Sequence, residues 1–171
     1  MTDNRRLEAS LGALLKLERD GLTFHRRASA IAADPRVRQL FERLAREREE
    51  ALSALEDAVG KAGVTPPTST APTVYPFEAV AKVECYACGY VSEEIPPSCP
   101  SCGAARYAFE KEFKPSMAWE ISVAAGKARI AEIEAAAPLA KGALKAAMET
   151  LLAQERAQLK AAEGELSSAR A

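Results

Sequence analysis

The segment ECYACGYVSEEIPPSCPSCGAARYAF, residues 84–109, holds all four cysteines of a 171-residue chain. Cys85 and Cys88 form one C-x-x-C pair, and Cys99 and Cys102 form a second, with ten residues between the pairs. Each pair can bend around one ion so that both sulfurs face it, and four thiolates in a tetrahedron suit iron or zinc. The spacing therefore predicts a metal site made by the four cysteines.

The residues around the cysteines support a metal site but leave its metal open. Gly89 and Gly103 follow the two pairs, where glycine lets backbone N–H groups point at the sulfurs. Tyr90, Tyr107 and Phe109 would cover the site with apolar surface. Such a cover suits a redox iron, but it serves equally as the small core of a zinc ribbon.

Composition and charge indicate the cellular compartment of the protein and the kinds of partner it has. The net charge is −1, so no excess of either sign points to nucleic acid or to an acidic lipid surface. No apolar run of about 18 residues is present, and the first ten residues, MTDNRRLEAS, lack the apolar core of a signal peptide. We therefore expect a cytoplasmic protein with no membrane or nucleic-acid partner. In that reducing compartment, clustered cysteines bind metals more often than they form disulfides.

The sequence before the cysteines predicts a helical hairpin. Leucines recur at steps of three and four from about residue 4 to residue 33. Asp34 is a good N-cap and Pro35 suits a first helical turn, so a second helix begins there and runs to about Gly60. So short a link predicts that the two helices lie antiparallel.

A second hairpin follows the cysteines. SMAWEISVAAGKARIAEIEAAA, after Pro115, predicts a third helix, and Pro138 begins a fourth. Between the first hairpin and the cysteines, GVTPPTSTAPTVYP predicts an extended, semi-rigid connector. The expected organisation is a first hairpin over residues 1–62, a Pro/Thr-rich linker over 63–80, a four-cysteine module over 81–112 and a second hairpin over 113–171.

Two hairpins joined by a long middle crossover predict a ferritin-like four-helix bundle, all-α except for a small β module in the crossover. The alternative is an elongated coiled coil, which helices of about 25 residues with internal breaks disfavour. The bundle can close within one chain or by exchange of hairpins between two chains. We expect a homodimer, because a thin, alanine-rich bundle gains stability from further burial.

The knuckles CYACGY and CPSCGA resemble those of a rubredoxin-like domain, and their short separation is similar to that in rubrerythrins. Rubrerythrins also have a ferritin-like bundle, with the iron–sulfur module usually appended at one end. The resemblance implies peroxide reduction at a di-iron centre, fed with electrons through the thiolate-bound iron, and a redox partner protein.

That resemblance implies inward carboxylates on two helices and a Glu-x-x-His pair on each of the other two. The repeat of LARER at 44–48 as LAQER at 152–156 aligns Glu47 with Glu155. The candidate ligands are Glu18, Glu47, Glu50, Glu120, Glu155 and Gln158. The only histidine, His25, lies on the first helix, so both Glu-x-x-His pairs are missing. We expect it to be a core or surface histidine with an ordinary hydrogen bond rather than a metal ligand.

Two states of the bundle interior remain open. The carboxylates can hold two iron or manganese ions without imidazole. Alternatively, Arg48 or Lys127 turns inward and pairs with Glu18 or Glu155, so that an ion pair replaces the metals. The missing imidazoles and the nearby arginines favour the ion pair, and the charge-dense stretch REREE is typical of an exposed face.

Three functions follow from these alternatives. The first is a rubrerythrin-like electron-transfer or redox protein with a four-cysteine iron site and a degenerate di-iron centre. The second is a peroxide-reducing rubrerythrin with a carboxylate-rich di-metal site, and the third is a zinc-ribbon structural or docking protein. The sequence indicates no catalytic residue, because a single histidine and clustered thiols leave no partners for a catalytic triad.

Overall fold

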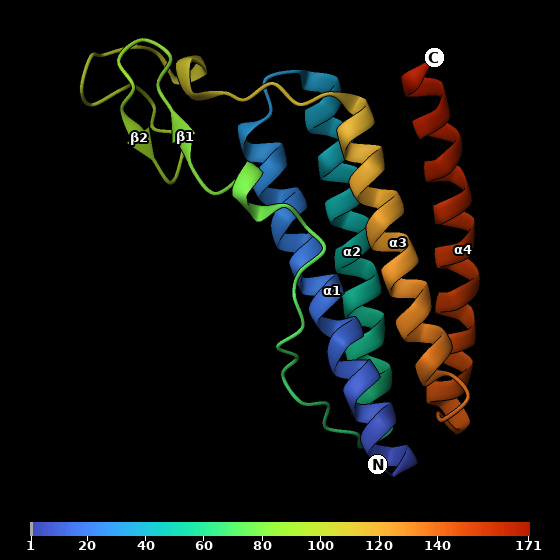
Figure 1. Cartoon of the computed structure of the whole chain (residues 1–171). Helices are drawn as coiled ribbons and strands as arrows, with labels where there is room; N and C mark the ends of the chain where they lie inside the picture. Colours follow the sequence, from blue (N-terminus) through green and yellow to red (C-terminus); the bar gives the residue numbers. More distant parts are fainter. Residues whose placement is uncertain (1) are drawn as a thin grey trace.

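The computed structural model describes residues 2–171 and contains a bundle of four long helices with a small β module at one end (Figure 1). The helices are α1 (Asp3–Ile31), α2 (Pro35–Lys61), α3 (Pro115–Ala136) and α4 (Gly142–Arg170). The module contains the antiparallel strands β1 (Val83–Glu84) and β2 (Val91–Ser92), and the short 3-10 helices are η1 (Phe77–Ala79) and η2 (Arg106–Phe109). None of the described helices is both long and apolar enough to cross a membrane. The predicted helical bundle with a small β module is confirmed.

The chain runs through the bundle as two hairpins. α1 packs mainly against α2 and α3, whereas α4 packs mainly against α3 and less closely against α2. The crossover after α2 returns the chain to the end of the bundle where α2 began, so that α2 and α3 run in the same direction (Figure 1). Each helix is therefore antiparallel to both of its main neighbours, and the long connection joins α2 and α3, which lie diagonally across the bundle.

Helix boundaries follow the capping chemistry of the sequence in the first hairpin but not in the second. The Asp34 carboxylate accepts a hydrogen bond from the Arg36 amide at 2.8 Å, which starts α2 as predicted. The prediction that Pro138 begins the fourth helix is wrong, because α4 begins at Gly142. The Ala140 N–H donates to the Ala136 carbonyl at 3.1 Å. This bond extends the last turn of α3 past Pro138 and delays the next helix.

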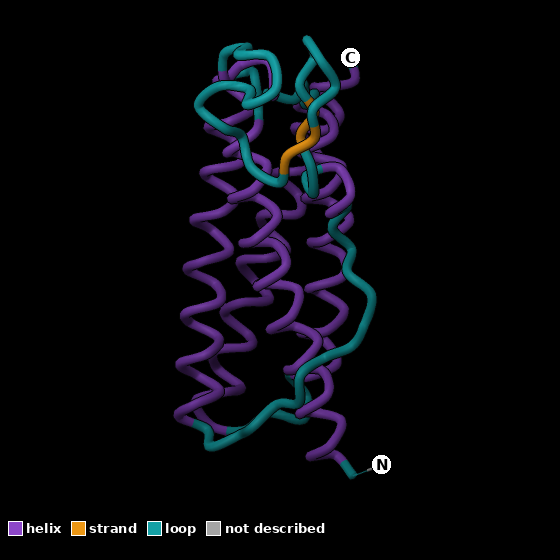
Figure 2. The backbone as a smooth tube through the Cα atoms, turned by 90° about the vertical axis from the view of Figure 1, so that its left-hand side faces the viewer, coloured by secondary structure: helices purple, strands orange, loops and turns teal. Residues whose placement is uncertain are grey.

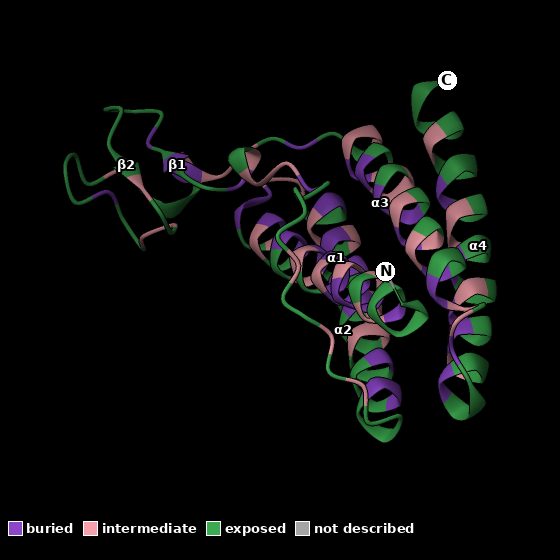
Figure 3. Cartoon of the chain, turned by 60° about the horizontal axis from the view of Figure 1, so that its bottom comes forward, coloured by how far each residue is buried: buried purple, intermediate pink, exposed green. Residues whose placement is uncertain are grey.

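The β module and the bundle share one hydrophobic core. Figure 3 shows the buried faces of the helices turned toward one another. At the module end, Phe24 and Phe41 of the bundle belong to the same buried cluster as Val83, Cys85 and Cys99. The module is therefore packed onto the end of the bundle rather than held by a free tether.

Backbone contacts fix the module in place. The Arg27 guanidinium donates to the carbonyls of Val80 and Ala81 at 2.8 and 3.1 Å. The Lys111 amide donates to the Ile31 carbonyl at 2.8 Å, which ties the exit from the module to the end of α1. Both ends of the module are thus hydrogen-bonded to the first hairpin.

The Pro/Thr-rich crossover lies along the helices from one end of the bundle to the other (Figure 2). It approaches α1 so closely that a methyl group on Gly12 would lie 2.4 Å from the Pro67 carbonyl oxygen. Further along, Tyr75 is buried within the bundle. The crossover is a packed part of the fold, and Gly12 provides the room for it.

Gly12→Ala should destabilise the protein by about 1–3 kcal/mol, because the new methyl group overlaps the Pro67 carbonyl. Gly164→Ala is the matched control, since a methyl group there meets nothing within 4 Å and alanine favours a helix by about 1 kcal/mol. Urea unfolding of both variants measures the difference. Equal or greater stability of Gly12→Ala would show that the crossover does not pack on α1.

Candidate functional site

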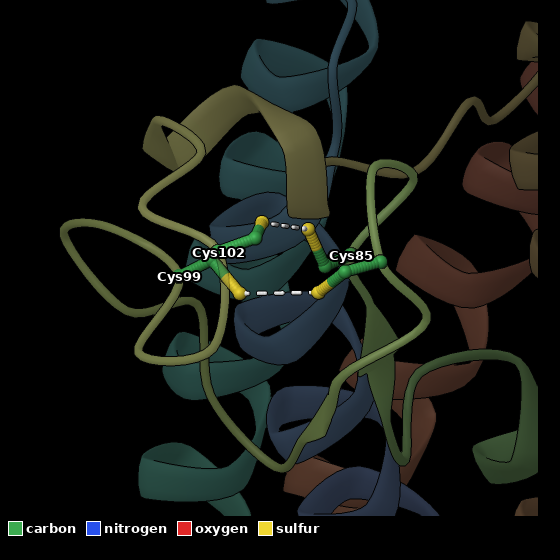
Figure 4. A group of neighbouring side chains, drawn as sticks. Cys85, Cys99 and Cys102 are labelled. Carbon is green, nitrogen blue, oxygen red and sulfur yellow. Dashed lines mark hydrogen bonds between the residues drawn. The ribbon is translucent and has the colours of Figure 1, made fainter.

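The four cysteine sulfurs meet in one cluster at the end of the bundle (Figure 4). Cys85 Sγ lies 3.8 Å from Cys102 Sγ, Cys88 Sγ lies 3.6 Å from Cys99 Sγ, and all four atoms lie within 4.8 Å of one another. A disulfide needs a separation of about 2.05 Å, so the sulfurs are not bonded in pairs. A tetrahedron with metal–sulfur bonds of about 2.3 Å has edges of about 3.8 Å. The cluster therefore fits a single iron or zinc ion.

The two C-x-x-C knuckles share one backbone design. In the first, the Cys85 N–H donates to the Tyr90 carbonyl at 2.9 Å, and the Gly89 N–H donates to the Cys85 carbonyl at 2.8 Å. Gly89 has a φ of 77°, which only glycine adopts at low cost. Cys99 and Gly103 repeat this geometry in the second knuckle. Each knuckle thus turns its two sulfurs toward the shared centre.

In each C-x-x-C pair the first cysteine is buried and the second is exposed. Cys85 and Cys99 are buried against the bundle, whereas Cys88 and Cys102 are exposed. Burial by itself would raise the pKa of the Cys99 thiol, but the backbone amides of Cys102 and Ser101 lower this pKa to about 7. The Ala104 amide would lower the pKa of the Cys102 thiol, but the neighbouring thiols of Cys88, Cys99 and Cys85, together with burial, raise it to about 12. These two thiols therefore do not ionise alike, and Cys99 is converted more readily than Cys102 to the thiolate form that binds metals.

A second cluster lies in the middle of the bundle, where each helix contributes one buried charged residue. These are Glu18 of α1, Arg48 of α2, Arg129 of α3 and Glu155 of α4. Arg48 Nη1 donates to Glu155 at 2.7 Å and to Glu18 at 3.0 Å. Arg129 Nε donates to Glu155 at 2.8 Å and lies 3.6 Å from Glu18. The predicted pairing of Arg48 with these carboxylates is confirmed.

The crossover completes this charge network. Arg129 Nη1 donates to the Tyr75 hydroxyl at 3.0 Å, and Arg48 Nη2 donates to the Gln158 side-chain oxygen at 2.6 Å. A methyl group on Gly21 would lie 2.4 Å from the Tyr75 hydroxyl oxygen, so the glycine makes room for the phenol. The network therefore contains groups from all four helices and from the connection between the hairpins.

The two buried carboxyl groups differ in their electrostatics. Burial raises the pKa of Glu18, and the contacts of Arg48 and Arg129, at 3.0 Å or longer, only partly oppose this rise. Burial also opposes ionisation of Glu155, but the closer guanidinium groups of Arg129 and Arg48 lower its pKa below the ordinary value. Glu155 is thus the more firmly ionised of the two.

The structure brings together only some of the predicted bundle ligands. Glu18, Glu155 and Gln158 belong to the network, but Glu50 and Glu120 are exposed. Glu47 is half-buried and forms no hydrogen bond to the network among the described residues. Of the two cations expected as alternatives for the inward position, Arg48 takes it, whereas the Lys127 ammonium group pairs with Glu163 on the surface at 3.5 Å.

The alignment of the LARER and LAQER repeats gave the wrong register for α2. It equated Glu47 with Glu155, whereas the inward residue of α2 is Arg48. Arg48 lies seven residues from both Phe41 and Leu55, which are also buried. That seven-residue spacing was the signal for an inward arginine.

Sequence reasoning missed two members of the network. Arg129 is buried and lies four residues from both Ala125 and Ile133, which are also buried, so its place in the apolar seam was visible in the pattern. Tyr75 comes from a segment without periodicity, and nothing in the sequence indicated its burial.

The single histidine lies beside this network without joining it. His25 is 2% exposed, stacks on Phe41 and packs edge-on against Tyr75. The expected core position is confirmed, but the expected hydrogen bond is missing at Nδ1, which is buried and has no partner among the described residues. Burial, together with the positive charges of Arg48 and Arg129, lowers the pKa of His25 to about 3. The imidazole is therefore neutral at physiological pH.

Comparisons with protein-family models, with curated protein sequences and with solved structures gave no match to this chain. The resemblance to rubrerythrins stays a prediction that depends on the cysteine knuckles and on the order of the helices.

Arg48→Met should destabilise the fold by about 3–5 kcal/mol, because it leaves two buried carboxyl groups with one guanidinium partner. Arg156→Met is the matched control, because Arg156 pairs with Glu134 at a similar distance, 2.6 Å, but on the surface. Loss of this pair should change stability by less than about 1 kcal/mol. Urea unfolding provides the comparison. Similar small losses in both variants would contradict the buried network.

The contribution of His25 should make the protein less stable as the pH decreases from about 6.5 toward about 3. In this window His25 binds a proton in the unfolded chain but not in the folded one. Each pH unit of decrease therefore lowers the free energy of unfolding by up to about 1.4 kcal/mol.

His25→Phe keeps the aromatic packing and should lose less unfolding free energy as the pH falls. Protonation of Glu18, whose pKa is raised, favours the folded state, and protonation of Glu155, whose pKa is lowered, opposes it. Both carboxyl groups are present in the wild type and the variant, so the difference between the two proteins isolates His25. The NMR signal of the single imidazole reports its pKa directly. A value near 6.5 in the folded protein would refute this prediction.

Proposed function

We propose that this chain is a rubrerythrin-like metal-binding protein that carries one iron at its four cysteines and transfers single electrons through it. The observation that carries the proposal is the spacing of the sulfurs, 3.6 and 3.8 Å, which suits tetrahedral coordination of one ion. The resemblance of the knuckles to rubredoxin-like domains favours iron.

The residues around the cluster fit an electron-transfer role. Iron bound there supplies a one-electron couple. Cys88 and Cys102 are exposed residues, so one side of the cluster lies near the surface, where a redox partner protein can approach it. Tyr86, Val91 and Tyr107 of the same module are 71%, 52% and 74% exposed and offer apolar surface for that contact. The buried cysteines hold the other side of the site against the bundle.

The bundle supports the rest of the proposal, a ferritin-like fold with a degenerate di-iron centre. Its antiparallel neighbours and long middle crossover are the arrangement of ferritin-like bundles. Arg48 and Arg129 supply the positive charge that metal ions would otherwise bring to Glu18 and Glu155. Carboxylates already engaged by guanidinium groups are poorly placed to bind two metals.

A zinc-ribbon structural or docking role is the second candidate, and one observation favours it. The module has only two strands of two residues each, while Cys85 and Cys99 lie in its shared core with the bundle. An ion at the four sulfurs would hold such a small module together whether or not it changes its charge. Zinc fits the same sulfur spacing.

Metal analysis of the full chain, purified from its native host, separates these functions. The electron-transfer proposal expects about one iron per chain and a visible absorption that bleaches reversibly on reduction. A colourless protein with about one zinc would favour the docking role, and about three irons per chain would favour the peroxide-reducing enzyme. Homodimer formation and a cytoplasmic location stay predictions.

Two variants make the iron measurement specific. Cys102→Ser should lose most of the iron, because it removes one of four thiolate ligands. Glu50→Gln changes a candidate ligand of the bundle that the structure leaves exposed, and should keep the full iron content. Loss of iron in Glu50→Gln would contradict the proposal and support a carboxylate site.

A further inference from the structure

A cavity of about 260 Å³ opens among α2, α3 and α4, next to the buried charge network. It is smaller than the sites of about 300–1,000 Å³ that hold drug-sized ligands, so it suits a small molecule. The residues that define its character are His25, Arg43, Trp119, Arg129, Gln158 and Leu159.

Two polar groups at this cavity lack partners. Arg129 uses Nε for Glu155 and Nη1 for Tyr75, and its Nη2 has no acceptor among residues 2–171. This Nη2 lies beside Gly126, where an added methyl group would be 3.9 Å from it, and Gly126 lines the cavity. His25 lines the same cavity and has an unpartnered Nδ1. Only the His25 Nδ1 is shut off from solvent, so only this atom carries the cost of an unpaired buried group, which a ligand can remove. The Nη2 of Arg129 is an accessible donor that a ligand can use.

The remaining walls of the cavity are largely apolar. Leu44, Leu159 and Ala162 line it, together with the indole ring of Trp119. The Arg43 guanidinium lies 5.6 Å from the centre of that ring. A ligand that fits these walls has a compact apolar body.

The charges around the cavity favour an anion over a cation. Its lining includes three arginines and two glutamates. Of the glutamates, Glu165 is exposed, and Glu47 lies 4.0 Å from Arg43. Behind the cavity, Glu155 already pairs with Arg48 and Arg129, at 2.7 and 2.8 Å. The preference for an anion therefore depends on the Nη2 of Arg129, which has no acceptor in the described part of the chain, and on Arg43 in the cavity wall.

We propose that this cavity binds a small organic carboxylate with a compact apolar body. The carboxylate would accept hydrogen bonds from Arg129 Nη2, and the body would pack against Trp119 and Leu159. This inference does not depend on the metal at the cysteines.

The chain contains one tryptophan, and Trp119 lines the cavity, so its fluorescence reports binding directly. Titration of the full chain with benzoate should give a saturable change in emission. Benzamide, a neutral molecule of nearly the same shape, should bind at least about tenfold more weakly, because it lacks the charge that strengthens the bond to a guanidinium group. No saturable change with benzoate, or equal binding of benzamide, would overturn the proposal without recourse to any variant.

Two variants of Ser122 in α3 test whether the ligand binds in this cavity. Ser122 lines the cavity, and its hydroxyl donates only to the Ala118 carbonyl, at 2.9 Å. Ser122→Leu should fill the cavity and abolish the benzoate response, whereas Ser122→Ala should keep it. An unchanged response in a folded Ser122→Leu protein would show that benzoate binds elsewhere and refute the site.

Discussion

Two guanidinium groups bridge two carboxyl groups at the centre of this bundle, and each of the four helices contributes one of these residues. Arg48 lies 2.7 Å from Glu155 and 3.0 Å from Glu18, and Arg129 lies 2.8 Å from Glu155. Moving these charges out of water is expensive, and only close pairing offsets the cost. Because a shift of any helix would break a pair, the network constrains the register of all four helices. Tyr75 extends that constraint to the crossover.

This constraint bears directly on function. The carboxylate oxygens are already hydrogen-bonded and charge-paired by arginines, so few oxygen atoms in the bundle interior are free to coordinate a redox metal. The sulfur cluster is different, since its four ligand atoms face one another and two of its cysteines are exposed. A protein of this kind would carry its metal at the end of the bundle, with the bundle as a rigid support. The shared core of module and helices fits that division.

Local patterns predicted most of the fold and all of the sulfur cluster. A C-x-x-C pair fixes its geometry within a few residues, and leucine periodicity identifies helices without knowledge of their neighbours. The interior charges were harder, because Glu47 and Arg48 differ by one position and about 100° around the helix. Only packing against the other helices decides which turns inward. The aperiodic segment around Tyr75 gave no such signal, and the bond from Ala140 to Ala136 displaced the start of α4.

X-ray absorption at the metal edge, recorded on the full chain from its native host, tests the central claim most directly. The account predicts that about four sulfur ligands at about 2.3 Å surround every metal atom, with no oxygen or nitrogen shell. A mixed shell rich in oxygen ligands would mean that metal occupies the bundle interior. That result would contradict the assignment of Arg48 and Arg129 as the counter-charges of Glu18 and Glu155.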